Sequence, residues 1–445
     1  MFKTFKKGGV HPLDSKISRD AAIEMFPLPE KGYVYLNQHL GAPAKPVVEK
    51  GTSVKVGDVL AEPNGFVSAF VHSPFSGVVE KIDEWTDVSG YKSQTIIIKV
   101  EGDEWRDDID RSNELIKDVK PSKEDIIKKL HQCGIVGLGG AAFPTHVKYT
   151  LPENKKADFL IINGVECEPY LTADFRLMLE YADEIMVGTT IQMKALGVDK
   201  AYIGIEANKP EAIELLSEKA KSYPGISIVP LKLKYPQGAE KQLIVAITGR
   251  YVPSGKLPID VGCVVDNIGT TYAVYNAIQK NRPIIDRVVT VTGHTMGKPS
   301  NFMTRIGTPI SQLLQAANLD FDNTGKIISG GPMMGKAITS LDIAVSKGTS
   351  GILAMGKNES YRSREYNCIR CAKCVDVCPM GLEPYLLMDH AKLQNWGTIE
   401  QHGMMDCLEC GCCQYICPAN RPLVDYLRIG KRTVGQIIRN RNVKK

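Results

Sequence analysis

Between residues 121 and 250 the chain alternates between apolar runs with strand character and segments with helical period. "PSKEDIIKKLHQCG" has apolar positions at helical spacing and begins with Ser122, a favoured helix cap. "ADFLIINGVECEPY" has the pattern of a buried strand that ends in a polar loop. Helices are then predicted over about 171–196, "PEAIELLSEKAKS" and "AEKQLIVAITG", and strands over "KAYIGIEA" and "GISIVPLKLKYP". This alternation predicts a parallel sheet that binds ligands at the carboxyl ends of its strands.

Two flanking regions follow other patterns. Residues 38–82 alternate short strands with turns, similar to a lipoyl or biotinyl barrel-sandwich hybrid. A carrier domain presents a lysine at its hairpin tip, but the tip here is "PNGFVS", with Gly65 and Phe66 at that place, so a structural or docking role is expected. Residues 286–345 predict a hairpin, a helix capped near Thr308 and a return strand.

Cysteine spacing carries the strongest chemical signal. "CIRCAKCVDVCP" at 368–379 returns as "CLECGCCQYICP" at 407–418. Both read C-x2-C-x2-C-x3-C-P, a spacing typical of [4Fe-4S] ligation in which the fourth cysteine serves the other cluster. Structural zinc, the main alternative, favours two C-x2-C pairs separated by a knuckle. The predicted ligands are Cys368, Cys371, Cys374 and Cys417 for one cluster, and Cys407, Cys410, Cys413 and Cys378 for the other.

The residues between the two cysteine motifs predict helices. "LEPYLLMDHAKLQNW" has apolar positions at helical spacing, so an α-helical ferredoxin is expected rather than one joined through β-structure. Cys412 lies inside the second motif but outside its frame, and we expect it to be a small packing residue.

Composition limits the function classes. The 445 residues are 43% hydrophobic and 24% charged, which suits several folded domains, and a net charge of +5 is too small and dispersed to indicate nucleic-acid binding. Cys133, Cys167 and Cys263 are scattered, so a reducing, cytoplasmic setting is expected. No signal peptide or membrane-spanning run is evident. The tail 428–445 has seven basic and no acidic residues, and a solvated helix is favoured there over docking to an anionic surface.

A glycine-rich loop precedes the first strand of the predicted sheet. Gly137, Gly139 and Gly140 lie in "GLGGAAFPT", which follows a helix, whereas the dinucleotide fingerprint G-x-G-x-x-G follows a strand. The ordinary fingerprint is therefore absent. Such a loop can let a flat ring or pyrophosphate approach backbone N–H groups, although a glycine-rich segment is more often a plain turn.

Four segments, in order, resemble the flavin- and NADH-binding subunit of respiratory complex I: "GLGGAAFPTHVKY", "NGVECEPY", "YPQGAEKQL" and "VVDNIGTTYAV". The resemblance implies a modified Rossmann-like domain that binds FMN non-covalently, with NADH stacked over it. It implies a cofactor-binding set with FMN contacts from Lys148, Asn163, Glu166, Gly238, Glu240 and Asn267, the loop glycines Gly137 and Gly139, and Gly140, Phe143 and Glu168 near the nicotinamide nucleotide. The chain departs from the family pattern at Val165 and Ala239.

This arrangement makes chemical sense. NADH delivers two electrons as a hydride, while an iron-sulfur cluster accepts one, so a flavin must stand between them. The protein would align and tune the cofactors, and no catalytic acid or nucleophile is expected.

The order of these regions along the chain, together with "FKKGGVHP" and "LNQHLGAPAKP", resembles that of the C subunits of Rnf complexes. Rnf complexes are membrane-bound NADH:ferredoxin oxidoreductases coupled to ion pumping. The implied fold is a multidomain α/β chain. Its expected parts are residues 1–115 with a barrel-sandwich hybrid at about 38–100, 116–285 as the FMN/NADH domain with a parallel sheet, 286–355 as a β-grasp module of SLBB type, and 356–445 as a helical ferredoxin domain with two [4Fe-4S] clusters and the basic tail.

The resemblance also implies a place and partners. It predicts a peripheral NADH-oxidising subunit on the cytoplasmic face of a bacterial membrane, which exchanges electrons with a cluster-bearing partner subunit and, indirectly, with ferredoxin. One alternative is an NADH-dependent cobalamin reductase of a bacterial microcompartment. Another is an electron-relay or docking subunit that does not oxidise NADH, which the departures at Val165 and Ala239 suggest.

Overall fold

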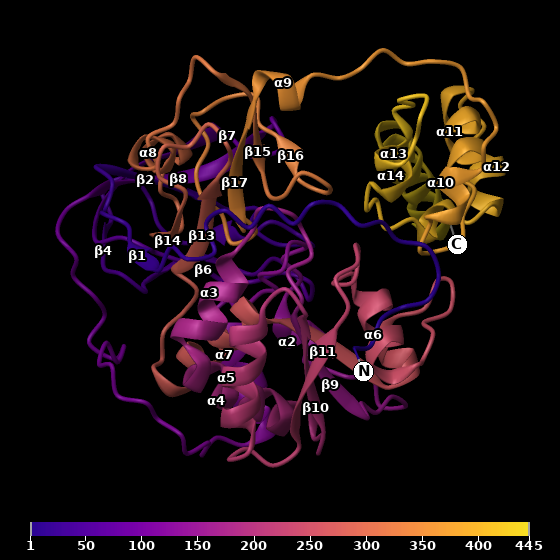
Figure 1. Ribbon diagram of the computed structural model, residues 1–445. Coiled ribbons are helices and arrows are strands. Elements are labelled where there is room, and N and C mark those ends of the chain that lie inside the picture. Colours follow the sequence, from indigo (N-terminus) through magenta and orange to yellow (C-terminus); the bar gives the residue numbers. More distant parts are fainter. Residues whose placement is uncertain (1, 444–445) are drawn as a thin grey trace.

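The computed structural model describes residues 2–443, and its secondary structure falls into four parts (Figure 1). A strand-rich N-terminal part and a mixed sheet lie together at the upper left of the view, above a parallel sheet with its helices (Figure 1). A helical C-terminal part lies to the right and is reached by a long linker (Figure 1).

The parallel sheet has the strand order β11-β10-β9-β12. Its strands are β9 (Phe159–Gly164), β10 (Ala201–Glu206), β11 (Ile226–Leu231) and β12 (Cys263–Asn267). The accompanying helices are α1 (Lys123–Gln132), α2 (Thr145–Tyr149), α3 (Ala173–Glu180), α4 (Ala182–Leu196), α5 (Pro210–Ala220), α6 (Glu240–Thr248), the 3₁₀ turn η1 (Pro258–Val261) and α7 (Ile268–Gln279). The parallel sheet predicted from the alternating pattern is confirmed.

Local signals explain where some of these helices begin and end. Ser122 caps α1 by accepting a hydrogen bond from the backbone N–H of Asp125 at 3.1 Å, as predicted. The single helical run predicted over about 171–196 is wrong, because α3 and α4 meet at Tyr181. Tyr181 leaves helical geometry at φ −127° and ψ 37°, and its ring lies 4.7 Å from that of Tyr272 on α7.

Two small antiparallel sheets, β2-β8-β7-β4 and β3-β5-β6, enclose an apolar core in the N-terminal part. Their strands are β2 (Lys31–Tyr35), β3 (Lys45–Pro46), β4 (Ser53–Val54), β5 (Val59–Glu62), β6 (Val71–His72), β7 (Gly77–Thr86) and β8 (Lys92–Val100). The predicted pattern of short strands is confirmed, and the strands begin at residue 31 rather than 38. Phe66, at the tip expected to lack a carrier lysine, is 65% exposed.

The mixed sheet has the order β1-β14-β13-β17-β15-β16, with β13 and β17 parallel at its centre. Its elements are β1 (Ile23–Met25), β13 (Asp286–Thr292), β14 (Ser300–Arg305), α8 (Ile310–Ala316), β15 (Thr324–Ser329), β16 (Lys336–Ala337) and β17 (Gly351–Gly356). The helix cap expected near Thr308 is wrong, because α8 begins after Pro309 without a side-chain cap. The Thr308 carbonyl instead accepts a hydrogen bond from the backbone of Val345 at 2.9 Å.

From residue 357 to 443 the described chain contains helices and turns and no strand, which confirms the helical structure predicted for this part. These elements are α9 (Lys357–Ser360), α10 (Lys373–Asp376), α11 (Pro384–Lys392), α12 (Trp396–Gln401), η2 (Met404–Asp406), α13 (Cys412–Tyr415) and α14 (Leu423–Val443). The basic tail continues α14, and its last two residues, 444 and 445, lie outside the described residues.

The N-terminal segment connects the parts of the molecule. Lys3 pairs in parallel with Leu231 at the end of β11, and Val10 forms an antiparallel bridge with Tyr235. The backbone N–H of Gly9 donates to the carbonyl of Val377 in the first cysteine motif at 2.8 Å. Residues 3–10, which we call the N-terminal strap, therefore lie between the parallel sheet and the helical C-terminal part. Figure 1 draws this strap in indigo.

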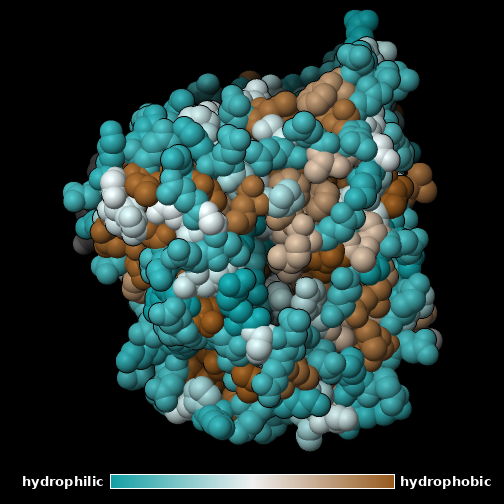
Figure 2. Space-filling model, turned by 90° about the vertical axis from the view of Figure 1, so that its left-hand side faces the viewer, coloured by the Kyte–Doolittle hydropathy of each residue, from teal (hydrophilic) through white to brown (hydrophobic). Residues whose placement is uncertain are grey.

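Hydrophilic side chains cover most of the face in Figure 2, with hydrophobic residues in separate patches between them. None of the helices described within residues 2–443 combines the length and apolar character that crossing a bilayer requires.

Candidate functional site

Two predicted flavin contacts lie side by side at the carboxyl edge of the parallel sheet. Asn163 of β9 and Asn267 of β12 are register partners. Asn163 donates from Nδ2 to the carbonyl of Gly238 at 2.8 Å. Asn267 caps α7 and donates from Nδ2 to Asp174 at 2.6 Å. The sheet thus brings Asn163, Gly238 and Asn267 together from three separate segments.

Lys148 of α2 reaches the same strand edge. Its Nζ donates to Asp266 at 2.9 Å and to the carbonyl of Val265 at 2.6 Å. Burial alone would lower the pKa of Lys148, but the charges of Asp266 and Glu240 outweigh burial and raise that pKa above its usual value. Lys148 therefore stays cationic and can balance the charge of a phosphate.

The predicted glycine loop presents bare backbone at this site. Gly139 and Gly140 are exposed, and Gly140 has φ +130°, which favours glycine. A Cβ on Gly139 would come within 3.1 Å of the Asn267 side chain, whereas one on Gly140 would meet nothing within 4 Å. The backbone N–H of Gly137 donates to the carbonyl of Phe143 at 2.9 Å and closes the loop.

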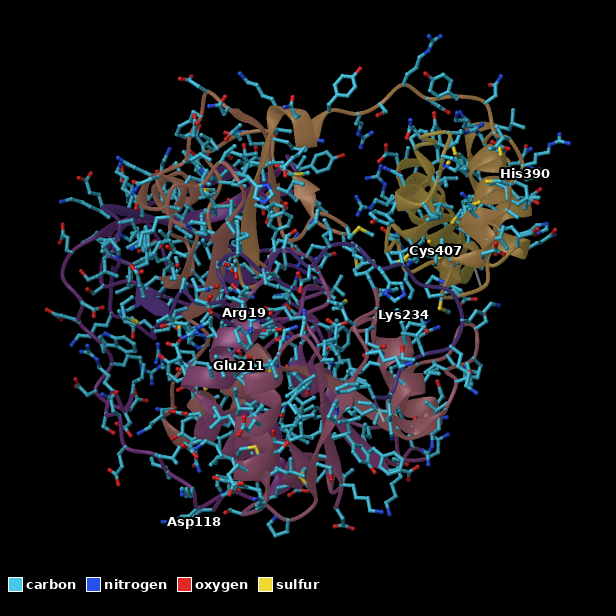
Figure 3. The ribbon with its side chains drawn as sticks, in the orientation of Figure 1. Arg19, Asp118, Glu211, Lys234, His390 and Cys407 are labelled. Carbon is cyan, nitrogen blue, oxygen red and sulfur yellow. The ribbon has the colours of Figure 1, made fainter. Side chains whose placement is uncertain are left out.

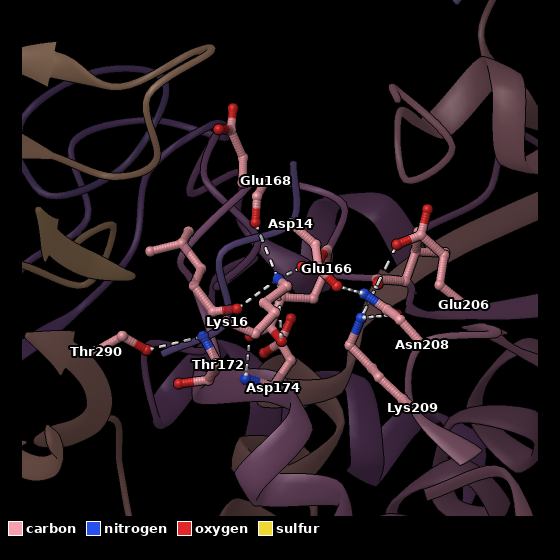
Figure 4. A network of polar contacts seen from close by, with 12 residues as sticks. Asp14, Lys16, Glu166, Glu168, Thr172, Asp174, Glu206, Asn208, Lys209 and Thr290 are labelled. Atoms are coloured by element: carbon pink, nitrogen blue, oxygen red, sulfur yellow. Dashed lines mark hydrogen bonds and ion pairs between the residues drawn. The ribbon is translucent and has the colours of Figure 1, made fainter. Parts of the chain in front are cut away.

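The loop after β9 carries the predicted acidic contacts, and a network of polar contacts holds it (Figure 4). The Glu166 carboxylate accepts the backbone N–H of Asp174 at 2.7 Å. Lys16, from the N-terminal segment, donates from Nζ to the carbonyls of Glu166 at 2.8 Å and Glu168 at 2.9 Å. Burial raises the pKa of Glu166 to about 7. Its Oε2 is buried with no hydrogen-bond partner among the residues that the structure describes.

Glu168 points away from Asp174 in Figure 4 and toward the glycine-rich turn 330–335. Its carboxylate accepts the backbone N–H groups of Met333 at 3.1 Å and Met334 at 2.8 Å, and the Tyr235 hydroxyl donates to it at 3.4 Å. Burial raises the pKa of Glu168 to about 7, and the two N–H groups oppose that shift. Glu168 therefore ties the loop after β9 to the turn 330–335.

The sequence patterns missed three charged residues of this network: Lys16, Glu206 and Lys209. Lys209 donates from Nζ to the carbonyl of Val165 at 2.8 Å and lies 3.9 Å from Glu206, and burial lowers its pKa to about 8. Glu206 ends β10, so its place at the carboxyl edge could have identified it. Lys16 lies in an extended segment that offers no such signal.

These residues fit an anionic flavin nucleotide. The site combines the cations Lys148, Lys16 and Lys209 with side-chain amides and exposed glycine backbone. The buried Oε2 atoms of Glu166 and Glu206 accept no hydrogen bond from the described residues and lie 3.8 Å from Lys16 and 3.9 Å from Lys209, respectively, which suits a site completed by a polar ligand.

The eight motif cysteines separate into two groups, and the outer group is open to solvent. Burial raises the pKa of the Cys374 thiol, and the neighbouring charges of Cys417 and Cys368 raise it further. Cys368 and Cys371 are exposed, and Cys374 and Cys417 are half-buried. The outer group is therefore reached from the surface.

The inner group is buried. Burial raises the pKa of the Cys413 thiol, and the charges of Cys407, Cys410 and Cys378 raise it further. All four line one cavity next to α13 and α14. Cys378 of the first motif thus lies with the second motif, as the crossed ligand pattern expects. The four inner cysteines surround a cavity, which fits a polynuclear cluster.

The inner group faces the parallel sheet. Cys410 and Cys412 pack against Tyr235 and Val10, with Met333 of the turn 330–335 at the edge of this contact. Cys412 is fully buried and donates from Sγ to the carbonyl of Tyr235 at 3.9 Å, so it packs the junction as predicted. In Figure 3, Cys407 lies on the side of the helical part nearer Lys234, whereas His390 lies on the far side.

Three protein-family models match the chain. The RnfC barrel sandwich hybrid domain matches residues 3–103, the Nuo51 FMN-binding domain residues 130–276, and the 4Fe-4S dicluster domain residues 357–421. The FMN-binding match spans the glycine loop and the sheet edge described above, and the dicluster match spans both cysteine motifs.

Proteins similar to nearly the whole of this chain are known from several bacteria. The chain is 45% identical to the C subunit of the proton-translocating ferredoxin:NAD(+) oxidoreductase complex of Clostridium ljungdahlii, over 96% of this chain and 93% of that one. It is 43% identical to the C subunit of the Na(+)-translocating ferredoxin:NAD(+) oxidoreductase complex of Acetobacterium woodii, over 96% of each chain. It is 40% identical to the C subunit of the ion-translocating oxidoreductase complex of Rhodobacter capsulatus, over 96% of this chain and 82% of that one. The chain therefore belongs to the family of C subunits of the ion-translocating ferredoxin:NAD(+) oxidoreductase, or Rnf, complexes.

Proposed function

We propose that this protein is the NADH-dehydrogenase subunit of a membrane-bound Rnf complex and passes electrons between NADH and ferredoxin through FMN and two [4Fe-4S] clusters. Other subunits would couple this transfer to ion translocation. One observation carries the proposal: the inner cysteine group packs on Tyr235, whose hydroxyl donates to Glu168 of the flavin loop. This contact supports neighbouring positions for the proposed flavin and cluster sites.

The side chains at the sheet edge have distinct tasks in this proposal. Bound FMN supplies the change from two-electron to one-electron chemistry. Lys148 balances phosphate charge, Asn163 and Asn267 donate hydrogen bonds, and Gly139 and Gly140 admit a flat ring. The proposed FMN and NADH contacts are Gly137, Gly139, Gly140, Phe143, Lys148, Asn163, Glu166, Glu168, Gly238, Glu240 and Asn267.

The two clusters take different places in the electron path. The inner cluster, on Cys378, Cys407, Cys410 and Cys413, exchanges electrons with the flavin, because its ligands face Tyr235. The outer cluster, on Cys368, Cys371, Cys374 and Cys417, exchanges electrons with the partner, because two of these ligands are exposed.

The domain boundaries proposed for this function are 1–115, 116–285, 286–355 and 356–445. The third domain is proposed to be a β-grasp module of SLBB type. Its hairpin β13-β14, its helix α8 and the central parallel pair β13 and β17 support that fold. Strand β1, although N-terminal, pairs with this sheet and ties the first domain to the third.

The protein is proposed to sit peripherally on the cytoplasmic face of the membrane, held by other subunits of the complex. Its partners are those subunits, including one that bears clusters, and ferredoxin indirectly. The names of the relatives, which are subunits of multi-subunit translocating oxidoreductases, support this placement and do not favour a cobalamin reductase.

Anaerobic purification tests the proposal. The protein should release FMN on acid treatment, contain about eight iron atoms and lose its cluster absorbance when NADH is added. If dithionite bleaches the clusters but NADH does not, the chain is an electron-relay or docking subunit instead.

A further inference from the structure

The tip of the N-terminal barrel carries an exposed aromatic ring where a carrier domain would hold its lysine. We call residues 63–67 the barrel tip. Phe66 in this tip is 65% exposed, and Leu40 beside it is 52% exposed. Phe75 of the same barrel is fully buried in its apolar core, so core packing does not account for Phe66. The proposed function gives this ring no task.

Hydrogen bonds hold the backbone of the barrel tip against the segment 40–44. The backbone N–H of Ala42 donates to the carbonyl of Val67 at 3.0 Å, and the Ser68 hydroxyl donates to the carbonyl of Ala42 at 2.8 Å. Gly41 has φ +106°, and a Cβ there would come within 1.9 Å of the Val67 carbonyl oxygen. The Phe66 ring therefore stands on a fixed backbone.

The barrel tip lies beside the glycine loop of the proposed flavin site. The backbone N–H of Leu40 donates to the carbonyl of Ala142 in that loop at 3.1 Å. Burial lowers the pKa of His146 in α2 to about 4, and a hydrogen bond to the Phe66 backbone opposes that shift. Ala142 and His146 flank Phe143 in sequence. The barrel tip and the glycine loop thus form one continuous surface.

Bare backbone leads along this surface from the glycine loop to the barrel tip. Residues 139–141 are exposed, and a Cβ on Gly140 or Gly65 would meet nothing within 4 Å. On another side, the hydrogen bonds of Glu168 close the site against the turn 330–335. A ligand that begins at Gly140 and is longer than the flavin site therefore finds open space toward the barrel tip.

We propose that Phe66 is the platform on which the adenine ring of NADH stacks, while the nicotinamide lies over the flavin beside Gly140. This inference rests on the proposed function, since it takes the site to bind FMN and NADH. Adenine presents a flat π face, and an aromatic side chain with only two rotatable bonds loses little conformational freedom when it stacks. Leu40 extends the apolar surface next to the ring.

The barrel tip is a less suitable site for another protein subunit. Phe66 and Leu40 form a small apolar group, whereas a stable protein interface buries about 800 Å² on each partner. Continuity with the glycine loop instead favours a ligand that the flavin site itself binds.

Steady-state kinetics test the proposal with the cofactor-loaded full chain under anaerobic conditions. NADH and reduced nicotinamide mononucleotide, which lacks the adenosine half, are compared as electron donors with ferricyanide as the acceptor. The test variant is Phe66→Ser, and Phe66→Trp keeps a flat aromatic ring at the same position. The control is Phe321→Ser, which removes a phenylalanine of similar exposure, 55%, from the turn before β15.

Phe66→Ser should raise the KM for NADH about tenfold, because adenine stacking is lost, and should leave kcat unchanged. Its KM for reduced nicotinamide mononucleotide should equal that of the wild type, because this donor never reaches the barrel tip. Phe66→Trp and Phe321→Ser should keep the wild-type KM for both donors. FMN and iron contents should stay unchanged in all three variants, since both phenylalanines are exposed.

An unchanged KM for NADH in Phe66→Ser would overturn the proposal while leaving NADH oxidation by the wild type, and so the proposed function, intact. An equal rise of KM for both donors would overturn it too, because the barrel tip would then act on the nicotinamide half or on the flavin. A wild type that does not oxidise NADH would refute the proposed function itself, and this inference with it.

Discussion

Lys16 shows how one residue distant in sequence can shape a cofactor loop. Its side chain is 8% exposed, and its ammonium group donates to the carbonyls of Glu166 and Glu168 and lies 3.8 Å from the Glu166 carboxylate. Lys16→Met would leave these carbonyls without their charged donor.

Lys16→Met should lower the free energy of unfolding by about 3 kcal/mol, because a buried charged donor is lost and its acceptors remain. It should also lower the flavin content of the purified protein. Denaturant unfolding and acid-released FMN measure the two effects. The control Lys31→Met removes an exposed lysine that pairs only with Glu80 among the described residues and should change neither value. Full flavin content in Lys16→Met would separate Lys16 from the cofactor site.

Glu168→Gln should raise the KM for NADH about tenfold without loss of FMN. The carboxylate accepts two backbone N–H groups from the turn 330–335, whereas a carboxamide has one oxygen and must turn its NH₂ group toward one of them. Steady-state kinetics and flavin content give the two readouts. Flavin loss equal to the loss of activity would place Glu168 in the FMN site itself.

Among the individual residues of the site, sequence alone could predict those that come directly after strands. Asn163 and Asn267 end neighbouring parallel strands, so the predicted topology already places them together. It could not predict Lys16 or Lys209, because their roles depend on where an extended segment and a helix start pass beside the loop.

The extended N-terminal strap is the element that the hydrophobic pattern could not predict. The strap has no hydrophobic periodicity, because isolated bridges to Leu231 and Tyr235 hold it in place and it has no amphipathic face. The parallel sheet was predictable because each of its strands is an apolar run followed by a helical period. The break at Tyr181 was not, because a tertiary contact with Tyr272 accompanies it.

The strap also offers a test of its contact with the cysteine motif. Gly8 has φ +66°, and a Cβ there would come within 2.6 Å of the Cys378 backbone. Gly8→Ala should destabilise the protein by more than about 1 kcal/mol and lower its iron content, because the strain falls on a proposed cluster ligand. Gly51→Ala is the matched control: Gly51 has φ +90° but open space around it, so only the backbone strain remains and iron should be retained. Thermal unfolding and iron analysis decide, and equal iron loss in both variants would refute the contact.

The junction between the barrel and α1 predicts a pH dependence of stability. His72 of β6 is buried, and burial, together with the charges of Lys347 and Arg106, lowers its pKa from 6.5 to about 3. In the unfolded chain His72 therefore becomes protonated as the pH falls through about 6.5, whereas in the folded chain it stays neutral until the pH reaches about 3. This contribution to stability is complete above pH 6.5 and is lost as the pH falls toward 3.

His72→Gln should consequently show a smaller fall in Tm between pH 7 and pH 5 than the wild type, measured by thermal unfolding. A His72→Gln profile parallel to the wild type would show that His72 does not titrate on unfolding.

Across the molecule as a whole, the flavin loop, the strap, the turn 330–335 and the inner cysteine group meet around Tyr235. Cysteine spacing could predict two clusters, and the resemblance of four segments to the complex I subunit implied a flavin in the same chain. They could not predict which cluster lies inward, because the crossed pattern ties both motifs to both clusters. The burial of Cys378, Cys407, Cys410 and Cys413 supports the proposal that the cluster of the second motif is the inner one.

The proposed order of transfer takes electrons from NADH to the flavin, then to the inner cluster and then to the outer one. Anaerobic rapid mixing of NADH with Cys371→Ser and Cys410→Ser, followed by flavin and cluster absorbance, distinguishes this order from its reverse. Both variants should keep FMN and lose about half of the roughly eight irons. NADH should then bleach the remaining cluster in Cys371→Ser, but in Cys410→Ser it should reduce the flavin and leave the remaining cluster oxidised. The opposite pattern, or an undiminished iron content, would refute this order of transfer.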